Sequence, residues 1–255
     1  MTLTRLDSLV AATCVSEGER PLTSSGELIK VAHAAHLSDD PEPTDYKHFE
    51  IYGFNSGTRT QNGTDLATGI DFNYGAATDI QLTATLPAGF AFSPTMPTRF
   101  GASNVELAIK YRFLHQTEIG WDVAFFPRVF LPTSTNQIGD KEASLLLPFW
   151  IQRDLGSGWT TFGGGGCQIY SGSSGQNSCM AGGVLSRKIS DNLQIGGELF
   201  YQAPSAGSPA STSVGLGGVY DINQTYHLLG YVRTGIQNRS KTDQISWYTA
   251  VLVTF

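Results

Sequence analysis

Ser246 and His227 are the two residues of this 255-residue sequence whose types could support nucleophilic catalysis. A serine hydrolase needs both side chains close together on one face, with a third residue that orients the imidazole. The alternation of residue types lets Ser246 lie near an inward-facing His227. However, no Asp or Asn stands at an evident height to orient the ring. We therefore favour a polar lining over an active site and expect no enzymatic activity.

Other residue types with chemical potential also lack the pattern that their chemistry requires. The five histidines (33, 36, 48, 115 and 227) show no metal-ligand spacing on one strand face. The run Gly163-Gly164-Gly165-Gly166 is not followed by the Lys-Ser/Thr of a phosphate-binding loop, and it indicates a curved or closely packed strand. The net charge of -6 argues against a nucleic-acid partner. We expect no metal and no cofactor.

The carboxyl-terminal stretch, residues 243–255, gives the clearest structural signal. Every second residue from Ile245 onward is largely apolar, and this period of two indicates a β-strand. A transmembrane β-barrel must close its last strand on its first, because an open edge cannot be left in lipid. A terminal strand of this kind resembles the carboxyl-terminal signal of bacterial outer-membrane proteins, which the barrel assembly machinery reads. The residues that carry the signal here are Trp247, Val251, Val253 and Phe255.

Composition and periodicity extend this interpretation to most of the chain. Only 15% of the residues are charged, against about 25% in soluble domains, and no run approaches the ~18 apolar residues of a membrane helix. From residue 46 the sequence predicts a single all-β domain, an antiparallel transmembrane β-barrel of about twelve strands. The expected strands are roughly 47–56, 65–74, 78–86, 103–113, 119–131, 142–153, 158–169, 178–188, 192–202, 210–221, 225–237 and 243–255.

The connections between these segments alternate in length. Short turns, such as 115–118, are expected on the periplasmic side, and longer loops, such as 55–65, outside the cell. An even strand number places both termini on the periplasmic side. Aromatic residues near the short turns are expected to form an interfacial girdle, namely Tyr74, Tyr111, Phe113, Trp121, Trp159, Tyr226 and Phe255.

Charged residues recur on the face opposite the apolar one, which indicates a polar lumen. The residues that we expect to line it are Glu106, Lys110, Arg112, Asp122, Arg128, Glu198 and Arg233. Two registers of the hairpin around Gln116 keep the charged side chains of both strands on the lumen side. One pairs Lys110 with Asp122, and the other pairs Arg112 with Asp122 and Glu106 with Arg128. Either register would brace a narrow bore with opposite charges.

Cys167 and Cys179 lie symmetrically about Ser173, so a simple hairpin would place them opposite each other. Because the periplasm is oxidising, we expect them to form a disulfide. Residues 1–25 lack a charged start followed by an apolar run. We interpret residues 1–45 as a leader or periplasmic extension and assign residues 46–255 to the barrel.

Several stretches, read together, resemble outer-membrane β-barrels of the MetA-pathway phenol-degradation family. They are 38–48 (SDDPEPTDYKH), 73–75 (NYG), 106–113 (ELAIKYRF), 126–133 (FPRVFLPT), 159–166 (WTTFGGGG), 195–200 (IGGELF) and 218–222 (GVYDI). The resemblance covers about residues 37–255. It implies a location in the outer membrane of a Gram-negative bacterium, in contact with its lipid, and the passage of small hydrophobic or aromatic molecules.

We therefore expect a narrow, porin-like channel or transporter for small-molecule solutes across the outer membrane. Two alternatives remain open at this point. One is a barrel with a structural or adhesive role and no transport, and the other is a lipid-modifying enzyme of the outer membrane.

Overall fold

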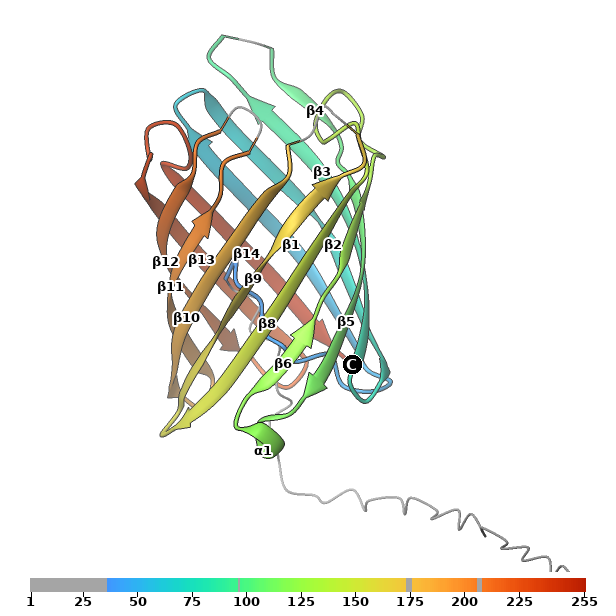
Figure 1. Ribbon diagram of the computed structural model, residues 1–255, viewed down its shortest axis with the longest axis vertical. Helices are drawn as coiled ribbons and strands as arrows, with labels where there is room; N and C mark the ends of the chain where they lie inside the picture. Colours follow the sequence, from blue (N-terminus) through green and yellow to red (C-terminus); the bar gives the residue numbers. More distant parts are fainter. Residues whose placement is uncertain (1–35, 96, 173–175, 206–207) are drawn as a thin grey trace, which may run out of the picture.

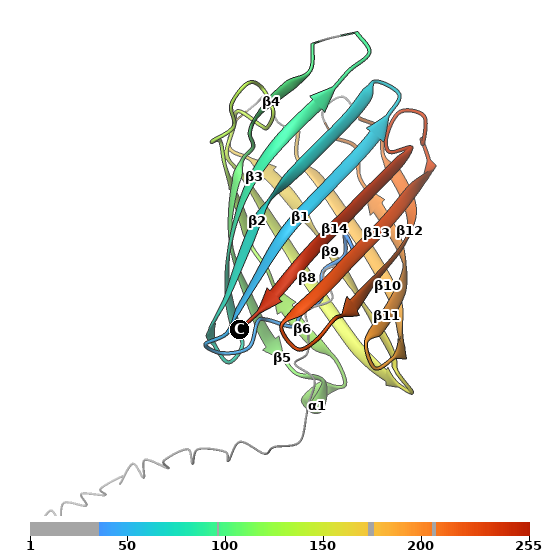
Figure 2. The same ribbon diagram turned by 180° about the vertical axis from the view of Figure 1, so that it is seen from behind.

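The computed structural model describes residues 36–95, 97–172, 176–205 and 208–255. These residues form one closed antiparallel β-barrel with tilted strands, seen from opposite sides in Figures 1 and 2. The first strand pairs with the last along ten residue pairs, from Glu50 with Thr254 to Arg59 with Ile245. Within these ranges, no helix is long and apolar enough to cross a membrane.

Fourteen β segments make up twelve barrel strands, because two of the strands are each interrupted once. β4 and β5 both pair with β3, and β6 and β7 both lie between β5 and β8. Pro127 separates β6 from β7, where it can give no hydrogen bond to the ladder. The segments are β1 (Phe49–Thr60), β2 (Gly63–Ala77), β3 (Ile80–Phe92), β4 (Arg99–Ala102), β5 (Val105–Leu114), β6 (Asp122–Phe125), β7 (Arg128–Leu131), β8 (Ser144–Gly156), β9 (Trp159–Tyr170), β10 (Ser178–Ser190), β11 (Leu193–Gln202), β12 (Ser211–Asp221), β13 (Tyr226–Gln237) and β14 (Ile245–Thr254).

Two connections differ from the sequence-based expectation. The expected extracellular loop at 55–65 is a tight turn, since β1 extends to Thr60 and β2 begins at Gly63. The expected tight turn at 115–118 instead contains the short helix α1 (Gln116–Ile119). Gly120 ends this helix in the left-handed conformation, with φ of 84°, and the Asp122 carboxylate accepts the free Gln116 N–H at 3.0 Å.

The two faces of the wall have opposite character. On β5 the outward side chains Leu107, Ile109 and Tyr111 are about half exposed, whereas the inward Ala108 and Lys110 are buried. Predicted girdle residues near the short turns are exposed on the same outer surface, among them Trp159, Tyr226 and Phe255. An apolar outer belt with a polar interior is what a barrel needs in lipid.

The register between β5 and the following strand matches neither of the two that the sequence offers. Ala108 lies opposite Arg128, and Tyr111 lies opposite Phe125. The helix α1 and an irregularity between Arg112 and Leu114 take up residues that a tight turn would have left in the ladder. Asp122 therefore lies opposite neither Lys110 nor Arg112. The expected ion pair between Glu106 and Arg128 does form, at 3.3 Å, although the two residues are not direct ladder partners.

Cys167 of β9 and Cys179 of β10 are direct ladder partners and form a disulfide. Both are exposed on the outer surface, at the end of the hairpin that carries the loop 171–177. The third cysteine, Cys14, lies outside the described residues. We expect unreduced, denatured protein to present one free thiol per chain and reduced protein to present three. Three thiols without reductant would contradict the bridge.

Candidate functional site

Residues 36–45, which precede the first strand, lie inside the barrel, and we call them the plug. In Figures 1 and 2 this segment runs from the middle of the bore to the end where the short turns and the carboxyl terminus lie. Ser38, Asp40 and Thr44 are almost completely buried, with relative exposures of 0%, 0% and 1%. The part of the expected extension that the structure describes thus fills the lumen, while residues 1–35 lie outside the described residues.

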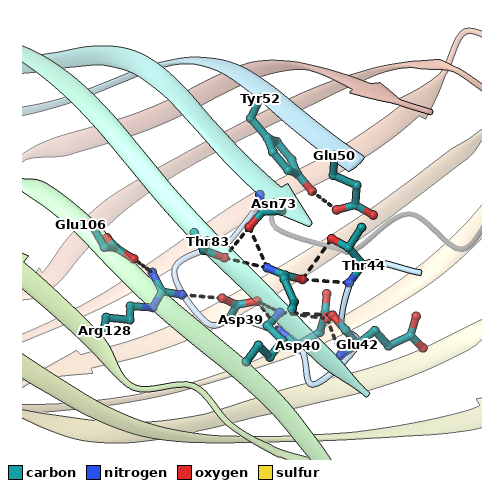
Figure 3. A network of polar contacts seen from close by, with 12 residues as sticks. Asp39, Asp40, Glu42, Thr44, Glu50, Tyr52, Asn73, Thr83, Glu106 and Arg128 are labelled. Atoms are coloured by element: carbon teal, nitrogen blue, oxygen red, sulfur yellow. Dashed lines mark hydrogen bonds and ion pairs between the residues drawn. The ribbon is translucent and has the colours of Figure 1, made fainter. Parts of the chain in front are cut away.

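Ion pairs hold one side of the plug to the wall formed by β5 and β7. Asp39 lies 3.0 Å from Lys110 Nζ and 2.6 Å from an Arg128 nitrogen. Arg128 also contacts Glu106 at 3.3 Å, so that it bridges the plug and the wall (Figure 3). Burial alone would raise the pKa of Asp39, but the two cations outweigh burial and hold this pKa below its ordinary value of 3.8.

Backbone hydrogen bonds hold the opposite side of the plug. The Glu198 carboxylate of β11 accepts the N–H groups of Ser38 at 2.7 Å and Leu37 at 3.3 Å, and the Tyr231 hydroxyl donates to the same carboxylate. The wall has no side chain at Gly182, where an added Cβ would lie only 2.3 Å from Ser38 Oγ. Close approach of the plug therefore depends on a glycine at this position.

Amide side chains fix the end of the plug nearest the periplasm. Thr44 donates to Gln81 Oε1 from its backbone N–H at 2.8 Å and from its hydroxyl at 3.1 Å. The Gln81 amide is oriented in turn by Asn73, whose Oδ1 accepts its N–H at 2.7 Å. Thr44 and Asn73 are labelled in Figure 3. On β8, Gln152 donates to Glu42 at 2.8 Å. The plug is thus bound to the wall at its start, middle and end.

Large side chains fill space around the plug. Trp150 packs with Ala108 and Phe126 in one buried cluster, and Leu252 packs with Tyr52 in another. Trp150 and Leu252 have relative exposures of 1% and 0%. Together with the plug, these side chains narrow the bore.

A cavity of about 600 Å³ lies between the plug and the extracellular ends of β1 and β2. His36, Leu37 and Asp39 of the plug belong to its lining, together with Thr58 and Asp65 near the extracellular rim. Its wall also carries inward aromatic rings. Phe54 and Tyr248 are stacked there with centroids 6.2 Å apart, next to Tyr52. The volume suits a small organic molecule.

The seven residues expected to line the lumen occupy three different environments. Four of them line the cavity, namely Glu106, Lys110, Arg128 and Arg233. Glu198 is buried against the plug, with 4% exposure. The last two residues lie beside short connections. Arg112 forms an ion pair with Asp79 at 3.0 Å, and the Asp122 carboxylate accepts the backbone N–H of Gln116, the first residue of α1.

Sequence reasoning did not identify the plug residues that partner these side chains, above all Asp39, Glu42 and Thr44. They belong to the stretch 38–48 that carries the family resemblance, but their residue types form only a cluster of acidic residues and prolines in 39–43. Such a cluster is more typical of a solvated linker than of a buried segment.

The position of Asp122 leads to a prediction about ion selectivity. Because its carboxylate binds the α1 backbone, Asp122→Ala should leave the anion-to-cation permeability ratio in planar bilayers unchanged. The lost hydrogen bond should lower the free energy of unfolding by about 1 kcal/mol, measurable by urea titration in lipid vesicles. A clear shift of the ratio toward anions would place this carboxylate in the conduction path instead.

The residues considered for nucleophilic chemistry lie apart. His227 pairs with Leu252 across β13 and β14, whereas Ser246 pairs with Arg233 farther along the same ladder. His227 does have a carboxylate partner, since its Nδ1 lies 2.7 Å from Asp221, but its Nε2 faces the buried Thr254 hydroxyl at 3.3 Å. That hydroxyl donates to the Gln224 carbonyl, so the arrangement ties the turn 222–225 to β14.

Within the described ranges, no group of three His, Cys, Asp or Glu residues is placed to hold a metal ion.

Solved structures, though not sequences, resemble this chain. No family model and no curated protein matches it. The COG4313 outer membrane channel from Pseudomonas putida F1 superposes with a TM-score of 0.67 at 13% identity, over 85% of this chain and 98% of that one. The KdgM porin gives 0.57 at 9% identity, over 81% and 99%. The NanC porin gives 0.51 at 8% identity, over 81% and 98%.

At identities this low, the superpositions establish a shared fold and no more. Together with the closed wall and its apolar outer belt, this shared fold shows that the protein is a twelve-stranded β-barrel of the bacterial outer membrane.

Proposed function

We propose that the protein is a channel that admits small hydrophobic or aromatic molecules from the extracellular side, as its resemblance to the MetA-pathway phenol-degradation family implies. The observation that carries the proposal is the cavity of about 600 Å³, which ends on the plug instead of on the barrel wall. A barrel with a purely structural role would have no need of a cavity that ends on a separate segment of chain.

The lining of the cavity supports aromatic solutes. The rings of Phe54 and Tyr248 are only partly buried and line one wall beside the buried Tyr52, and aromatic faces bind other rings by offset stacking. Four charged residues of the lining pair with one another, since Lys110 and Arg128 both contact Asp39 and Arg128 also contacts Glu106. The bore is thus polar enough to hold water while it offers an apolar surface on one side.

Liposome swelling tests the proposal with two neutral solutes that differ by one ring, methyl β-glucoside and phenyl β-glucoside. In an inert narrow pore the larger phenyl compound should enter more slowly. We expect it to enter at least as fast as the methyl compound, and we expect Phe54→Ala/Tyr248→Ala to remove this advantage.

Two results would count against parts of this proposal. Swelling no faster than in protein-free liposomes would favour a structural or adhesive barrel. Equal discrimination against the phenyl compound in the parent and the variant would remove the aromatic preference but leave the channel. The matched control is Tyr111→Ala/Phe149→Ala, which removes two rings from the outer surface.

A further inference from the structure

A second pocket, of about 720 Å³, lies at the extracellular ends of β12, β13 and β14. It is separate from the plug and from the aromatic wall of the cavity. Its lining combines four aliphatic side chains with three arginines, of which Arg233 is paired with Asp243. These residues are Val214, Leu216, Val232, Ile245, Arg59, Arg233 and Arg239. The aliphatic side chains face outward and are 40–58% exposed. The pocket therefore opens toward the membrane.

The pocket exists because the sheet separates at this point. The regular pairing of β13 with β14 ends at Arg233 opposite Ser246. Beyond it the strands are joined by the Gly235 N–H, which donates to the Asp243 carbonyl at 3.0 Å. The Thr234 hydroxyl also donates to the Gln244 carbonyl at 2.8 Å. These bonds fold the loop 238–244 back over the rim and fix its position.

Two of the arginines, Arg59 and Arg239, line the pocket from different parts of the chain. Arg59 is exposed on β1 and lies directly opposite Ile245 of β14. Arg239 donates from Nε to Thr234 Oγ1 at 3.1 Å, which leaves its terminal nitrogens available. In the part of the chain that the structure describes, neither arginine forms an ion pair. The acidic residue of the loop, Asp243, is 4% exposed and is paired with Arg233 at 3.0 Å.

An aliphatic floor with two unneutralised guanidinium groups fits a ligand that is apolar at one end and anionic at the other. The extracellular end of the wall meets the headgroups of the outer leaflet, whose lipid is phosphorylated and carries several acyl chains. Guanidinium groups bind phosphate through paired hydrogen bonds, and aliphatic side chains pack against acyl chains.

We propose that this pocket binds a phosphorylated lipid of the outer leaflet, of the lipid A type. Its phosphate lies between Arg59 and Arg239, and an acyl chain lies along Leu216 and Val232. This site does not depend on transport, because it opens on the outer surface of the barrel.

The test uses full-length protein in detergent and measures the binding of bisphosphorylated lipid A by native mass spectrometry. Arg59→Gln/Arg239→Gln should weaken binding about tenfold or more, which corresponds to a loss of about 1.4 kcal/mol. The matched control is Arg153→Gln/Arg187→Gln. It removes two exposed arginines at the periplasmic rim, where they lie over Trp121 and Trp159 at 5.6 and 5.1 Å. The control should bind like the parent.

Two further probes identify the chemistry. Lipid A without phosphates should bind the parent weakly. Its affinity should equal that of bisphosphorylated lipid A for Arg59→Gln/Arg239→Gln. Inorganic phosphate at millimolar concentration should not displace the lipid, because it lacks acyl chains. Equal binding by the variant and the control would overturn the proposal. So would tight binding of the phosphate-free lipid, or complete displacement by inorganic phosphate. Retention of the heat-modifiable band on electrophoresis verifies that each variant is folded.

Discussion

Replacement of residues 36–45 by a Gly-Ser segment of the same length should raise the single-channel conductance in planar bilayers several-fold. The plug contacts the wall on opposite sides of the bore, through Lys110 and Arg128 on one side and Glu198 on the other. A Gly-Ser segment can make none of these side-chain contacts, and its conformational entropy opposes ordering in the lumen. The wall should remain closed, because the strand ladders do not involve the plug.

The same variant should admit sugars that the parent excludes in liposome swelling, since the cavity above the plug would then continue to the periplasmic end. Trp150 and Leu252 remain in place in the variant and limit the gain. If the conductance and the size limit match those of the parent, these packed side chains close the bore and the plug is not the barrier. Heat-modifiable migration on electrophoresis would show that the barrel is intact.

The strands of the wall were predictable from sequence because the pattern that defines each strand lies within a few consecutive residues. Each strand must place apolar residues outward at every second position, and Leu107, Ile109 and Tyr111 show this without any knowledge of their neighbours. The terminal strand was recognisable for the same reason, and Val251 and Phe255 lie on the exposed face. The pairing of the two cysteines followed from the symmetry of one hairpin.

Register and the plug were not predictable, because they depend on contacts that the local pattern does not encode. Because the helix α1 takes up residues after β5, the register between β5 and the next strand differs from the predicted ones. Lys110 therefore lies against Phe126 instead of an acidic residue on that strand. The acidic partners of Lys110 lie about seventy residues earlier, at Asp39 and Asp40. Nothing in the polar segment 36–45 shows that its carboxylates meet lysine and arginine side chains inside a bore.

Asp39→Asn should weaken the docking of the plug more than any other single conservative change within it. The substitution keeps the size of the side chain but leaves Lys110, with a side-chain exposure of 3%, without its closest anion. Loss of one partner of a buried ion pair costs about 3–5 kcal/mol. Asp40 at 3.8 Å from Lys110 and Glu106 at 3.3 Å from Arg128 offset part of this cost. We expect a net loss of about 2 kcal/mol, or roughly a thirtyfold shift toward the undocked state.

The readout is the frequency of openings to the large-conductance state in planar bilayers at pH 7. The matched control is Asp79→Asn, which also breaks an aspartate–arginine pair, in this case with Arg112 at 3.0 Å beside a short turn and away from the plug. The control should open as rarely as the parent. Equal opening frequencies for Asp39→Asn and Asp79→Asn would show that the Asp39 ion pairs do not hold the plug.

The pH dependence of opening separates Asp39 from the groups around it. Because its two cations hold the pKa of Asp39 below 3.8 in the docked state, its contribution to docking is complete above the ordinary pKa. It is lost only as the pH falls through the lowered value. The parent should therefore stay closed from pH 7 to pH 5 and begin to open below about pH 4. The other titratable or charged groups near Asp39 are Asp40, Asp71, Glu106, Lys110, Arg128 and Tyr248.

Asp39→Asn should open equally often at pH 7 and pH 5, and its opening frequency at pH 7 should already approach that of the acidified parent. Opening of the parent between pH 7 and pH 5 that persists in Asp39→Asn would assign the acid response to groups other than Asp39. Opening in that range that disappears in the variant would mean that Asp39 is protonated well above 3.8. Such a result would contradict the tight contacts of Asp39 with Lys110 and Arg128.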